Sequence, residues 1–322
     1  MIITRTPLRI SFCGGGTDLS AYYKKDGGAV ISSAIDKYIY VTVNKKFDDS
    51  VRVSYSVTEI VDDPQDLKHD IVRECLKMTG ITGGIEITTI ADIPAGTGLG
   101  SSSSFTIGLL NALYSYLGIT LSARELAEKA CEIEIRKLKH PIGKQDQYAA
   151  AFGGLNFFNF KKDGTVDRTP VTLSERDKRK MDRKLMMFYT GVTRKADNIL
   201  KEQREKTEKK RDILDFMKEQ AFEMHKLLLK DGFTSDFGKY LNEGWLKKKS
   251  LTDEISNGKI DSIYSKALRC GATGGKLLGA GGGGFILLYC DEEKQDLVRE
   301  EIGLREIDFH LVQQGSRVVY FA

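Results

Sequence analysis

Residues 94–105 read PAGTGLGSSSSF, a stretch in which three glycines and four serines precede an apolar segment. Glycine adopts backbone angles that other residues avoid, and it lets a ligand approach the main chain closely. Apolar residues then recur at helical spacing as far as Gly118, which predicts a helix that begins at the serines. A helix N-terminus presents unpaired amides, so the stretch predicts a phosphate-binding loop. The alternative is a plain loop followed by a capped helix, for which one serine would be enough.

The glycine spacing distinguishes this loop from two common nucleotide-binding motifs. It lacks the Gly-Lys-Ser/Thr ending of a P-loop, and its glycines follow GxGxG and not GxGxxG. A second glycine run, GAGGGGF at 279–285, formally matches GxGxxG. It leads into a predicted strand, whereas a dinucleotide-binding fingerprint opens a helix, so we expect no Rossmann site there.

Composition and cysteine usage are typical of a globular cytoplasmic protein. The chain has 322 residues, 41% of them hydrophobic, and this length favours two domains. The longest apolar run, FILLYC at 285–290, is too short to span a bilayer, and the first ten residues lack the layout of a signal peptide. The five cysteines form no CxxC pair, which indicates reduced thiols and neither disulfides nor zinc. We expect a cytoplasmic location and no membrane partner.

The charge pattern gives little support for a polyanionic partner. The formal net charge is +4, with 49 basic and 45 acidic residues. The basic clusters at 175–184 and 201–212 have acidic residues interleaved, which is typical of solvated helix faces with i,i+4 pairs. We therefore expect no nucleic-acid partner. The oligomeric state stays open between monomer and homodimer.

Strand and helix signals are mixed along the whole chain, which favours an α+β fold. Runs typical of strands occur at 8–12, 38–43, 51–55, 84–90, 155–160 and 185–190. Ser122 and Glu125 form a capping box that predicts a helix as far as about Leu138, and 143–154 predicts a short helix closed by glycines. Long charged helices follow a shift in composition near 170. We place the domain boundary there, which gives domains 1–168 and 169–322.

Two further segments carry residues suited to chemistry. In RTPLRISFCGGGTDL, at 5–19, a strand ends in three glycines followed by Thr17 and Asp18. Glu134 lies in the last turn of a predicted helix, where the dipole disfavours a carboxylate. A cation should therefore lie nearby, and Lys137, Lys139 or a metal ion could supply it.

Together these motifs resemble the GHMP family of small-molecule kinases. Pro94 followed by GLGSS at 98–102 is similar to the family's P-x-x-x-G-L-G-S-S phosphate loop, while 5–19 and 279–284 are similar to its first and third motifs. The resemblance covers most of the chain, from about residue 5 to 290. It implies a two-domain fold, with an N-terminal domain like ribosomal protein S5 domain 2 and a C-terminal ferredoxin-like domain.

The resemblance also implies ATP and Mg²⁺ as cofactors, and it gives roles to matching residues. It places the ATP phosphates on Gly96, Gly98, Leu99, Gly100, Ser101, Ser102, Ser103 and Ser104. It implies Ser102 and Glu134 as Mg²⁺ ligands, Asp146 as the catalytic aspartate and Arg9 as its cationic partner. It implies Asp18, Thr17, Gly16 and Gly282 as sugar-binding residues. Whether Asp146 deprotonates the acceptor hydroxyl or only orients it stays open.

Within the family, RISFCGGGTDL and FYTGVTRKADNIL (188–200) are most similar to the D-glycero-D-manno-heptose 7-phosphate kinases. This implies phosphorylation of the anomeric hydroxyl to give the 1,7-bisphosphate, for nucleotide-activated heptose and surface polysaccharide synthesis. A kinase of a neutral sugar similar to L-fucokinase, or a non-catalytic ATP- and sugar-binding sensor, is the alternative. Galactokinases place Gly-Glu-His where this chain has Gly-Gly-Gly, so galactose is not expected. A phosphorylated acceptor needs a cationic pocket, for which Arg194, Lys195 and Lys144 are candidates; Arg194, in a loop after a strand, is favoured.

Overall fold

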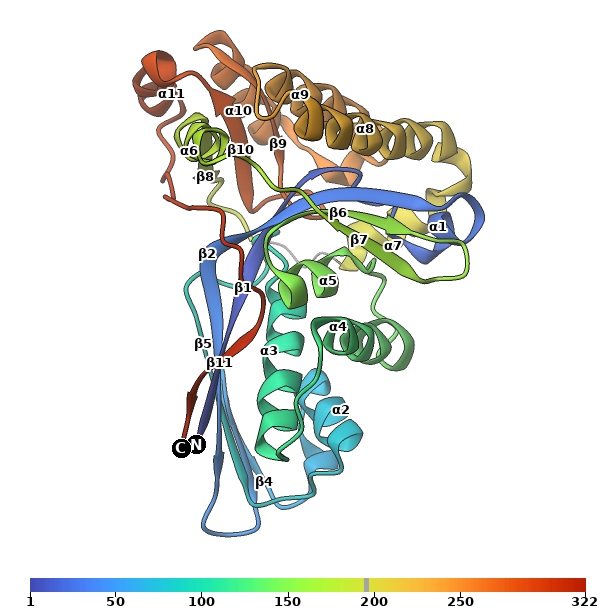
Figure 1. Cartoon of the computed structure of the whole chain (residues 1–322), viewed down its shortest axis with the longest axis vertical. Coiled ribbons are helices and arrows are strands. Elements are labelled where there is room, and N and C mark those ends of the chain that lie inside the picture. The colour runs from blue at the N-terminus through green and yellow to red at the C-terminus, as the bar shows by residue number, and fades with distance from the viewer. Residues whose placement is uncertain (194–196) are drawn as a thin grey trace.

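The computed structural model describes residues 1–193 and 197–322, apart from the side chains at 197, 198 and 204. The chain forms two halves of mixed helices and strands, one above the other in Figure 1. The first half contains β1 (Ile2–Cys13), α1 (Ser20–Asp26), β2 (Gly28–Lys45), β3 (Val51–Ser54), β4 (Thr58–Val61), α2 (Asp70–Thr79), β5 (Ile85–Ala91), α3 (Ser101–Tyr116), α4 (Ala123–Cys131), α5 (Gln145–Phe152), β6 (Leu155–Phe160) and β7 (Val166–Pro170). The second half contains α6 (Glu175–Lys184), β8 (Leu185–Tyr189), α7 (Asp197–Lys206), α8 (Arg211–Lys230), α9 (Asp236–Lys249), α10 (Gly258–Arg269), β9 (Ala272–Leu277), β10 (Phe285–Cys290) and α11 (Gln295–Ile302), and the last strand, β11 (Arg317–Phe321), belongs to the first half.

A large, mainly antiparallel sheet organises the first half. Within the described residues it has eight strands in the order β11-β1-β2-β5-β3-β4, with β6 paired to β2 and β7 paired to β6. Strand β2 is 18 residues long, so its first part pairs with β6 and its last part with β5. Helices α2 to α5 cover one face of this sheet (Figure 1). The N-terminal end of α3 lies at the boundary between the two halves.

The second half is built on a smaller antiparallel sheet, ordered β8-β10-β9 in the described chain. Helices α9 and α10 pack against it, while α8 lies beside α9 and packs against β1 and β2 of the first sheet (Figure 1). The chain then returns to the first half, because β11 pairs antiparallel with β1. The terminal nitrogen of Met1 lies 2.6 Å from the carbonyl oxygen of Ala322. A boundary at 168 stays a prediction, although β7 runs through it and the last strand belongs to the first sheet.

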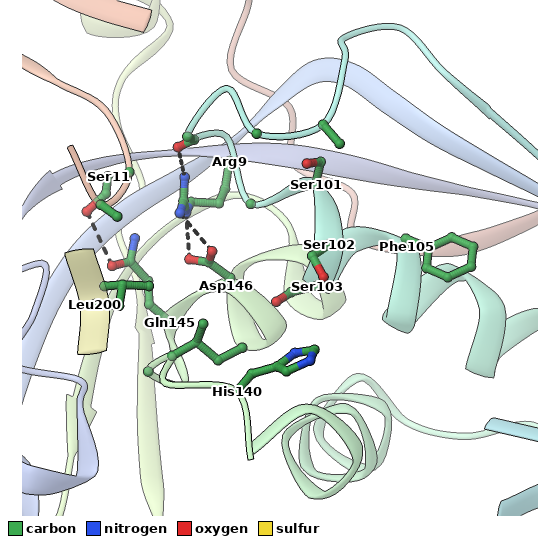
Figure 2. Close-up of a pocket in the computed structure, with 18 of the residues that line it drawn as sticks. Arg9, Ser11, Ser101, Ser102, Ser103, Phe105, His140, Gln145, Asp146 and Leu200 are labelled. Atoms are coloured by element: carbon green, nitrogen blue, oxygen red, sulfur yellow. Dashed lines mark hydrogen bonds and ion pairs between the residues drawn. The ribbon is translucent and has the colours of Figure 1, made fainter. Parts of the chain in front are cut away.

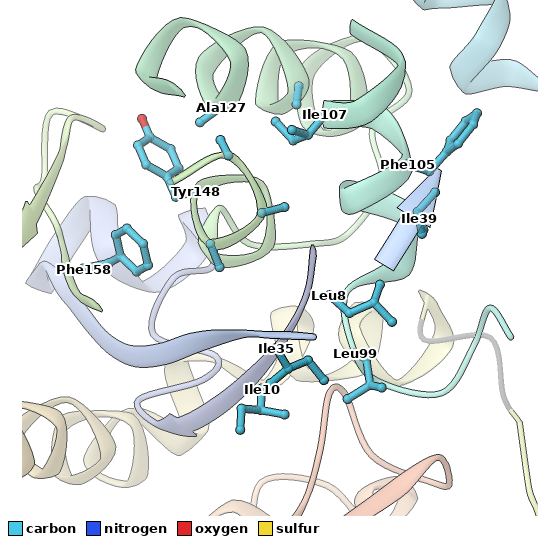
Figure 3. Packing of buried hydrophobic residues seen from close by; sticks show 14 of the residues in the cluster. Leu8, Ile10, Ile35, Ile39, Leu99, Phe105, Ile107, Ala127, Tyr148 and Phe158 are labelled. Atoms are coloured by element: carbon cyan, nitrogen blue, oxygen red, sulfur yellow. The ribbon is translucent and has the colours of Figure 1, made fainter. Parts of the chain in front are cut away.

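One apolar core is continuous between the two halves. Phe12 at the end of β1 packs edge-on against Phe237 of α9, with ring centroids 5.1 Å apart. Nearer the phosphate loop, Leu8 and Ile10 of β1 lie with Leu99 in the same buried cluster (Figure 3). The buried Leu99 side chain therefore holds the loop against the core, while Gly98 and Gly100 on either side of it line the cavity described below.

The elements predicted from sequence are found, with one informative difference. The predicted strands lie in β1, β2, β3, β5, β6 and β8, and the short helix at 143–154 is α5. The helix expected to reach Leu138 instead ends at Cys131 and continues as a π-helical turn over Glu132–Lys137. A π-turn inserts an extra residue into the helix and often marks a functional site. Glu134 lies in this turn, so the irregularity sets the direction of its side chain. Among the described residues, no helix is long and apolar enough to cross a bilayer.

The capping box that begins α4 is present as predicted. The Glu125 amide donates to Ser122 Oγ at 3.2 Å, and the Ser122 amide donates to Glu125 Oε2 at 2.7 Å. Loss of such a cap typically costs about 1 kcal/mol. We expect Ser122→Ala to lower the free energy of unfolding by about that amount, measured by urea denaturation. An unchanged midpoint would mean that the box does not stabilise α4.

Candidate active site

A cavity of about 910 Å³ lies where the two halves meet. The loop before α3, the glycine turn after β1, the segment at 140–146 and the loop after β9 all contribute to its walls. Figure 2 shows Ser101, Ser102 and Ser103 on one side of the cavity, with Arg9 and Asp146 opposite them. Segments far apart in the sequence, including all of the motifs identified above, therefore meet in one place.

The three glycines of PAGTGLGSSSSF all require the left-handed region of backbone space. Gly96, Gly98 and Gly100 have φ angles of 77°, 84° and 75°. Gly100 is the N-cap of α3 and provides no side-chain cap, so the first amides of the helix remain available to a ligand. These amides belong to Ser101, Ser102 and Ser103, which line the cavity. An anion at this helix N-terminus would receive their hydrogen bonds and the favourable end of the dipole.

The serine hydroxyls have structural partners and do not cap the helix. Ser102 Oγ and Ser103 Oγ lie 3.2 and 3.3 Å from Glu134 Oε1. Ser104 Oγ donates to the carbonyl oxygen of Pro7 at 2.8 Å, which ties α3 to β1. Ser104 and Leu99 are buried outside the cavity wall, and the Leu99 carbonyl accepts the Arg9 amide at 3.0 Å. These two residues therefore position the loop, whereas the others predicted at the phosphates face the cavity.

The third glycine segment packs directly against the phosphate loop. A Cβ atom added at Gly98 would lie 2.5 Å from the carbonyl oxygen of Leu278, just before the run 279–284. Gly98 also has a positive φ, so any larger residue there would strain the backbone and push the two loops apart. This close approach explains why two glycine-rich segments from different halves are needed at one site.

Arg9 and Asp146 form a two-pronged ion pair at the centre of the cavity (Figure 2). Arg9 Nε and Nη2 donate to Asp146 Oδ1 and Oδ2 at 2.7 and 2.8 Å. Arg9 Nη1 donates to the carbonyl oxygen of Gly98 at 2.6 Å, which fixes the guanidinium against the phosphate loop. The Asp146 side chain is 29% exposed, so an acceptor hydroxyl can reach it. The resemblance implied this pairing, and the catalytic roles of the two residues stay a prediction.

Glu134 is a fully buried carboxyl group held by uncharged donors. Besides the two serines, Gln147 Nε2 donates to its Oε2 at 2.8 Å. Burial raises the pKa of Glu134 to about 7, and the three hydrogen bonds offset only part of this. The cation expected near it is not Lys137, which instead lies 3.6 Å from Glu132, and no lysine is paired with Glu134 in the described residues. Among the described residues no lysine or arginine therefore neutralises Glu134, and His140 is the one cationic group that lowers its pKa.

A divalent cation would supply the positive charge that Glu134 lacks. A carboxylate and a hydroxyl are hard oxygen ligands of the kind that Mg²⁺ takes, and Glu134 and Ser102 place them side by side. In the described chain no three His, Cys, Asp or Glu side chains gather into a metal cage. This too suits Mg²⁺, which usually takes one or two protein carboxylates and fills its remaining positions with phosphate oxygens and water.

The glycine turn after β1 forms the other end of the cavity. The Asp18 carboxyl group is buried and accepts the amides of Gly16 and Gln145 at 3.0 and 3.1 Å. Burial raises the pKa of Asp18 above its usual value. A Cβ at Gly143 would collide with this carboxyl group, so glycine is required there. Gln203 of α7 also lines this end, and its Nε2 atom is buried without a hydrogen-bond partner.

Comparisons with known proteins agree with this geometry. The GHMP kinases N terminal domain model matches residues 67–154, and the GHMP kinases C terminal model matches residues 224–306. The chain is 32% identical to the D-glycero-alpha-D-manno-heptose 7-phosphate kinase of Campylobacter jejuni, over 98% of each chain. The chain belongs to the GHMP kinase family. It is thus an ATP-dependent phosphotransferase that acts on a sugar hydroxyl, with the two-domain fold of that family.

Two other GHMP kinases show how far the likeness extends. The chain is 28% identical to the L-fucokinase/L-fucose-1-P guanylyltransferase of Bacteroides fragilis, over 89% of this chain and 34% of that protein. A crystal structure titled D-glycero-D-manno-heptose 1-phosphate kinase, from Bacteroides thetaiotaomicron, superposes with a TM-score of 0.83 at 24% identity and covers all of both chains. The superposition shows the shared fold.

Some residues implied at the sugar of this GHMP kinase do not line the cavity. Thr17 is fully buried, and its Oγ1 bonds to Gly14 and Ala29 within the glycine turn. The Gly282 amide donates to the carbonyl oxygen of Ile255 at 2.9 Å, while Gly279 and Ala280 reach the cavity instead. Both residues therefore shape loops.

The three cations expected to bind an acceptor phosphate are not found in the described cavity wall. The Lys144 ammonium binds the carbonyl oxygen of Gly164 and lies 5.3 Å from the centre of the Tyr23 ring, away from the cavity wall. Arg194 and Lys195 lie outside the described residues.

Sequence reasoning missed two buried lysines in the cavity wall, Lys248 and Lys276. Both had a signal. Lys276 interrupts an otherwise small and apolar strand, and Lys248 shares a helical face with Phe237, Leu241 and Trp245. Within KKK at 247–249, only this periodicity separates the middle lysine from its neighbours.

Proposed function

We propose that this kinase transfers the γ-phosphate of ATP to the anomeric hydroxyl of D-glycero-D-manno-heptose 7-phosphate. The product would be the 1,7-bisphosphate, a precursor of nucleotide-activated heptose. The observation that carries the proposal is the 32% identity over 98% of both chains to a relative named for this substrate. The cavity supports it, because its acceptor end offers a buried carboxyl group at Asp18 and unpartnered side-chain Nε2 atoms at Gln145 and Gln203, all suited to sugar hydroxyls.

Each end of the cavity has a distinct task in this proposal. The amides of Ser101 to Ser103 bind the ATP phosphates, while Arg9 faces the phosphoryl group in transit. Ser102 and Glu134 would hold Mg²⁺, which when bound neutralises charge on the phosphates. Asp146 accepts the hydrogen bond of the acceptor hydroxyl and takes its proton as the new O–P bond forms and ADP leaves.

An apolar recess beside the phosphate loop suits the adenine base. His69 lies between two aromatic rings, with centroids 4.7 Å from Tyr55 and 5.1 Å from Phe105. Burial lowers the pKa of His69, which favours its neutral form. Ile71 and Ile93 complete the apolar walls, so a flat purine would bury its faces here.

A coupled assay of ADP release over a panel of acceptors tests the substrate. We expect the heptose 7-phosphate to exceed the free heptose in kcat/KM by about 10–150-fold, because a charge-assisted contact contributes about 1.5–3 kcal/mol. L-Fucose is the comparison that the second relative suggests. A kcat/KM for L-fucose or the free heptose that equals or exceeds the value for the 7-phosphate would contradict the proposal.

A further inference from the structure

We propose that Lys248 and Lys276 form an anion site that binds the phosphate already carried by the acceptor sugar. This inference rests on the proposed function, since it assigns residues to the part of the substrate that is not reacting. It concerns two side chains from the second half of the molecule, whereas the ATP phosphates are bound by the first half.

Both lysines are buried yet open onto the cavity. Lys248, in the last turn of α9, is 5% exposed, and Lys276, in β9, is 4% exposed. Lysine is almost never buried this deeply without a partner, because its ammonium group loses hydration. Both side chains belong to the cavity wall. A ligand there would meet two positive charges.

The partners that the structure provides do not neutralise these charges. Lys248 Nζ donates to the carbonyl oxygen of Gly279, and Lys276 Nζ donates to the carbonyl oxygen of Phe12 at 2.9 Å. An ammonium group has three N–H donors, so one carbonyl leaves two of them available. Among the side chains that the structure describes, neither lysine has an ion pair with a carboxylate. By contrast, Lys249 lies 2.5 Å from Asp261.

Burial and neighbouring charges act together on the two lysines. Burial lowers the pKa of Lys248 to about 7, and the positive charges of Lys276 and Arg9 lower it further, against the opposing effect of Asp18 and Asp146. Burial likewise lowers the pKa of Lys276 to about 8. A bound phosphate dianion would favour the charged form of both lysines.

The position of Lys276 favours the acceptor over ATP as the source of that phosphate, while Lys248 binds Gly279, which packs against Gly98 of the phosphate loop. The Phe12 carbonyl that holds Lys276 lies just before the glycine turn, whose Gly15, Gly16 and Asp18 line the acceptor end. Arg9 is already engaged by Asp146 and Gly98, and the amides that begin α3 are available for the nucleotide. The two lysines are thus the cations of the described cavity wall that lack an assigned anion.

The experiment compares Lys248→Met and Lys276→Met with Lys247→Met, an exposed neighbour on the same helix that serves as the control. Steady-state kinetics with the heptose 7-phosphate, the free heptose and ATP give each KM. We expect each of the two test variants to raise KM for the phosphorylated heptose about 10–150-fold. The KM for ATP and the turnover of free heptose should change less than about twofold, because neither contact involves them, and the control should match the parent in every value.

Two kinetic outcomes would overturn the inference. A raised KM for ATP with an unchanged acceptor KM would place the lysines at the transferred phosphate. An undiminished preference for the phosphorylated heptose in both variants would remove them from the site. The parent enzyme gives a test that needs no variant: without nucleotide, the heptose 7-phosphate must raise its thermal midpoint more than the free heptose does, and equal shifts would also overturn the inference.

The same panel separates this inference from the proposed function. If another phosphorylated sugar proves to be the better acceptor, the heptose assignment fails. The lysines are then judged by whether the two variants lose the preference for that sugar phosphate over its unphosphorylated form. If the parent enzyme prefers neutral sugars, both the proposed function and the phosphate site at the two lysines are wrong.

Discussion

Replacement of Asp146 by Asn is expected to lower kcat about 10²–10⁴-fold, the range typical of lost general-base catalysis. The amide keeps the shape of the side chain but cannot take the proton of the acceptor hydroxyl. It also cannot balance the charge of Arg9, whose Nε and Nη2 both donate to the carboxylate. The affinity for MgATP should change little, because the phosphate loop and Glu134 are untouched. Single-turnover measurements of ADP formation and calorimetric titration with nucleotide check the two halves of this expectation.

The alternative for Asp146 is that it merely caps α5. The structure gives this little support, since the N-cap residue of α5 is Lys144 and makes no side-chain cap. Asp167→Asn is a suitable control, because Asp167 also pairs with a cation, Lys161 at 2.9 Å, but lies at the surface. A folded Asp146→Asn enzyme that retained more than about a tenth of parental kcat would remove Asp146 from the chemistry.

Replacement of Glu134 by Gln is expected to raise the Mg²⁺ concentration needed for half-maximal activity by at least about tenfold, because even partners that only orient a metal ligand cost 10–100-fold when lost. Gln has nearly the same size and can still bond to Ser102, Ser103 and Gln147, so the fold should survive. The removal of a buried carboxyl group without a cationic partner should leave the thermal midpoint equal or higher when Mg²⁺ is absent.

Glu132 provides a matched control for this variant. It lies two residues away in the same π-helical turn, but it is paired with Lys137 at the surface. Glu132→Gln should show the parental dependence of rate on Mg²⁺. If Glu134→Gln also kept that dependence, then Glu134 would hold the loop through its hydrogen bonds and would not bind the metal.

The sequence predicted those parts of the site that depend on backbone conformation. Glycines at 96, 98 and 100 indicate positive φ angles, and a run of serines before an apolar segment indicates a helix N-terminus. Arg9 and Asp146 could be assigned only through the family resemblance, because their pairing joins β1 to α5, far apart in the chain. Local sequence patterns predict local backbone conformation, but they do not predict which distant segments come into contact.

The differences between sequence expectation and structure have the same physical origin. Thr17 and Gly282 sit in the correct motifs, but the direction of a side chain or amide within a tight loop depends on packing against other segments. The π-helical turn at Glu132–Lys137 escaped notice because its residues are ordinary helix formers. Lys248 could have been recognised, since at 100° per residue it lies nearest of the three lysines to the centre of the helical face formed by Phe237, Leu241 and Trp245.

The return of β11 to the first sheet has a consequence for biosynthesis. Ile2 pairs with Phe321, so one side of β1 is covered by residues that leave the ribosome long after β1 itself. Until they emerge, β1 presents the unpaired main-chain groups of an edge strand, which can pair with another chain. The sheet of the first half is therefore completed only after the second half has been translated, and a nascent chain must keep that edge from associating with its neighbours on the same polysome.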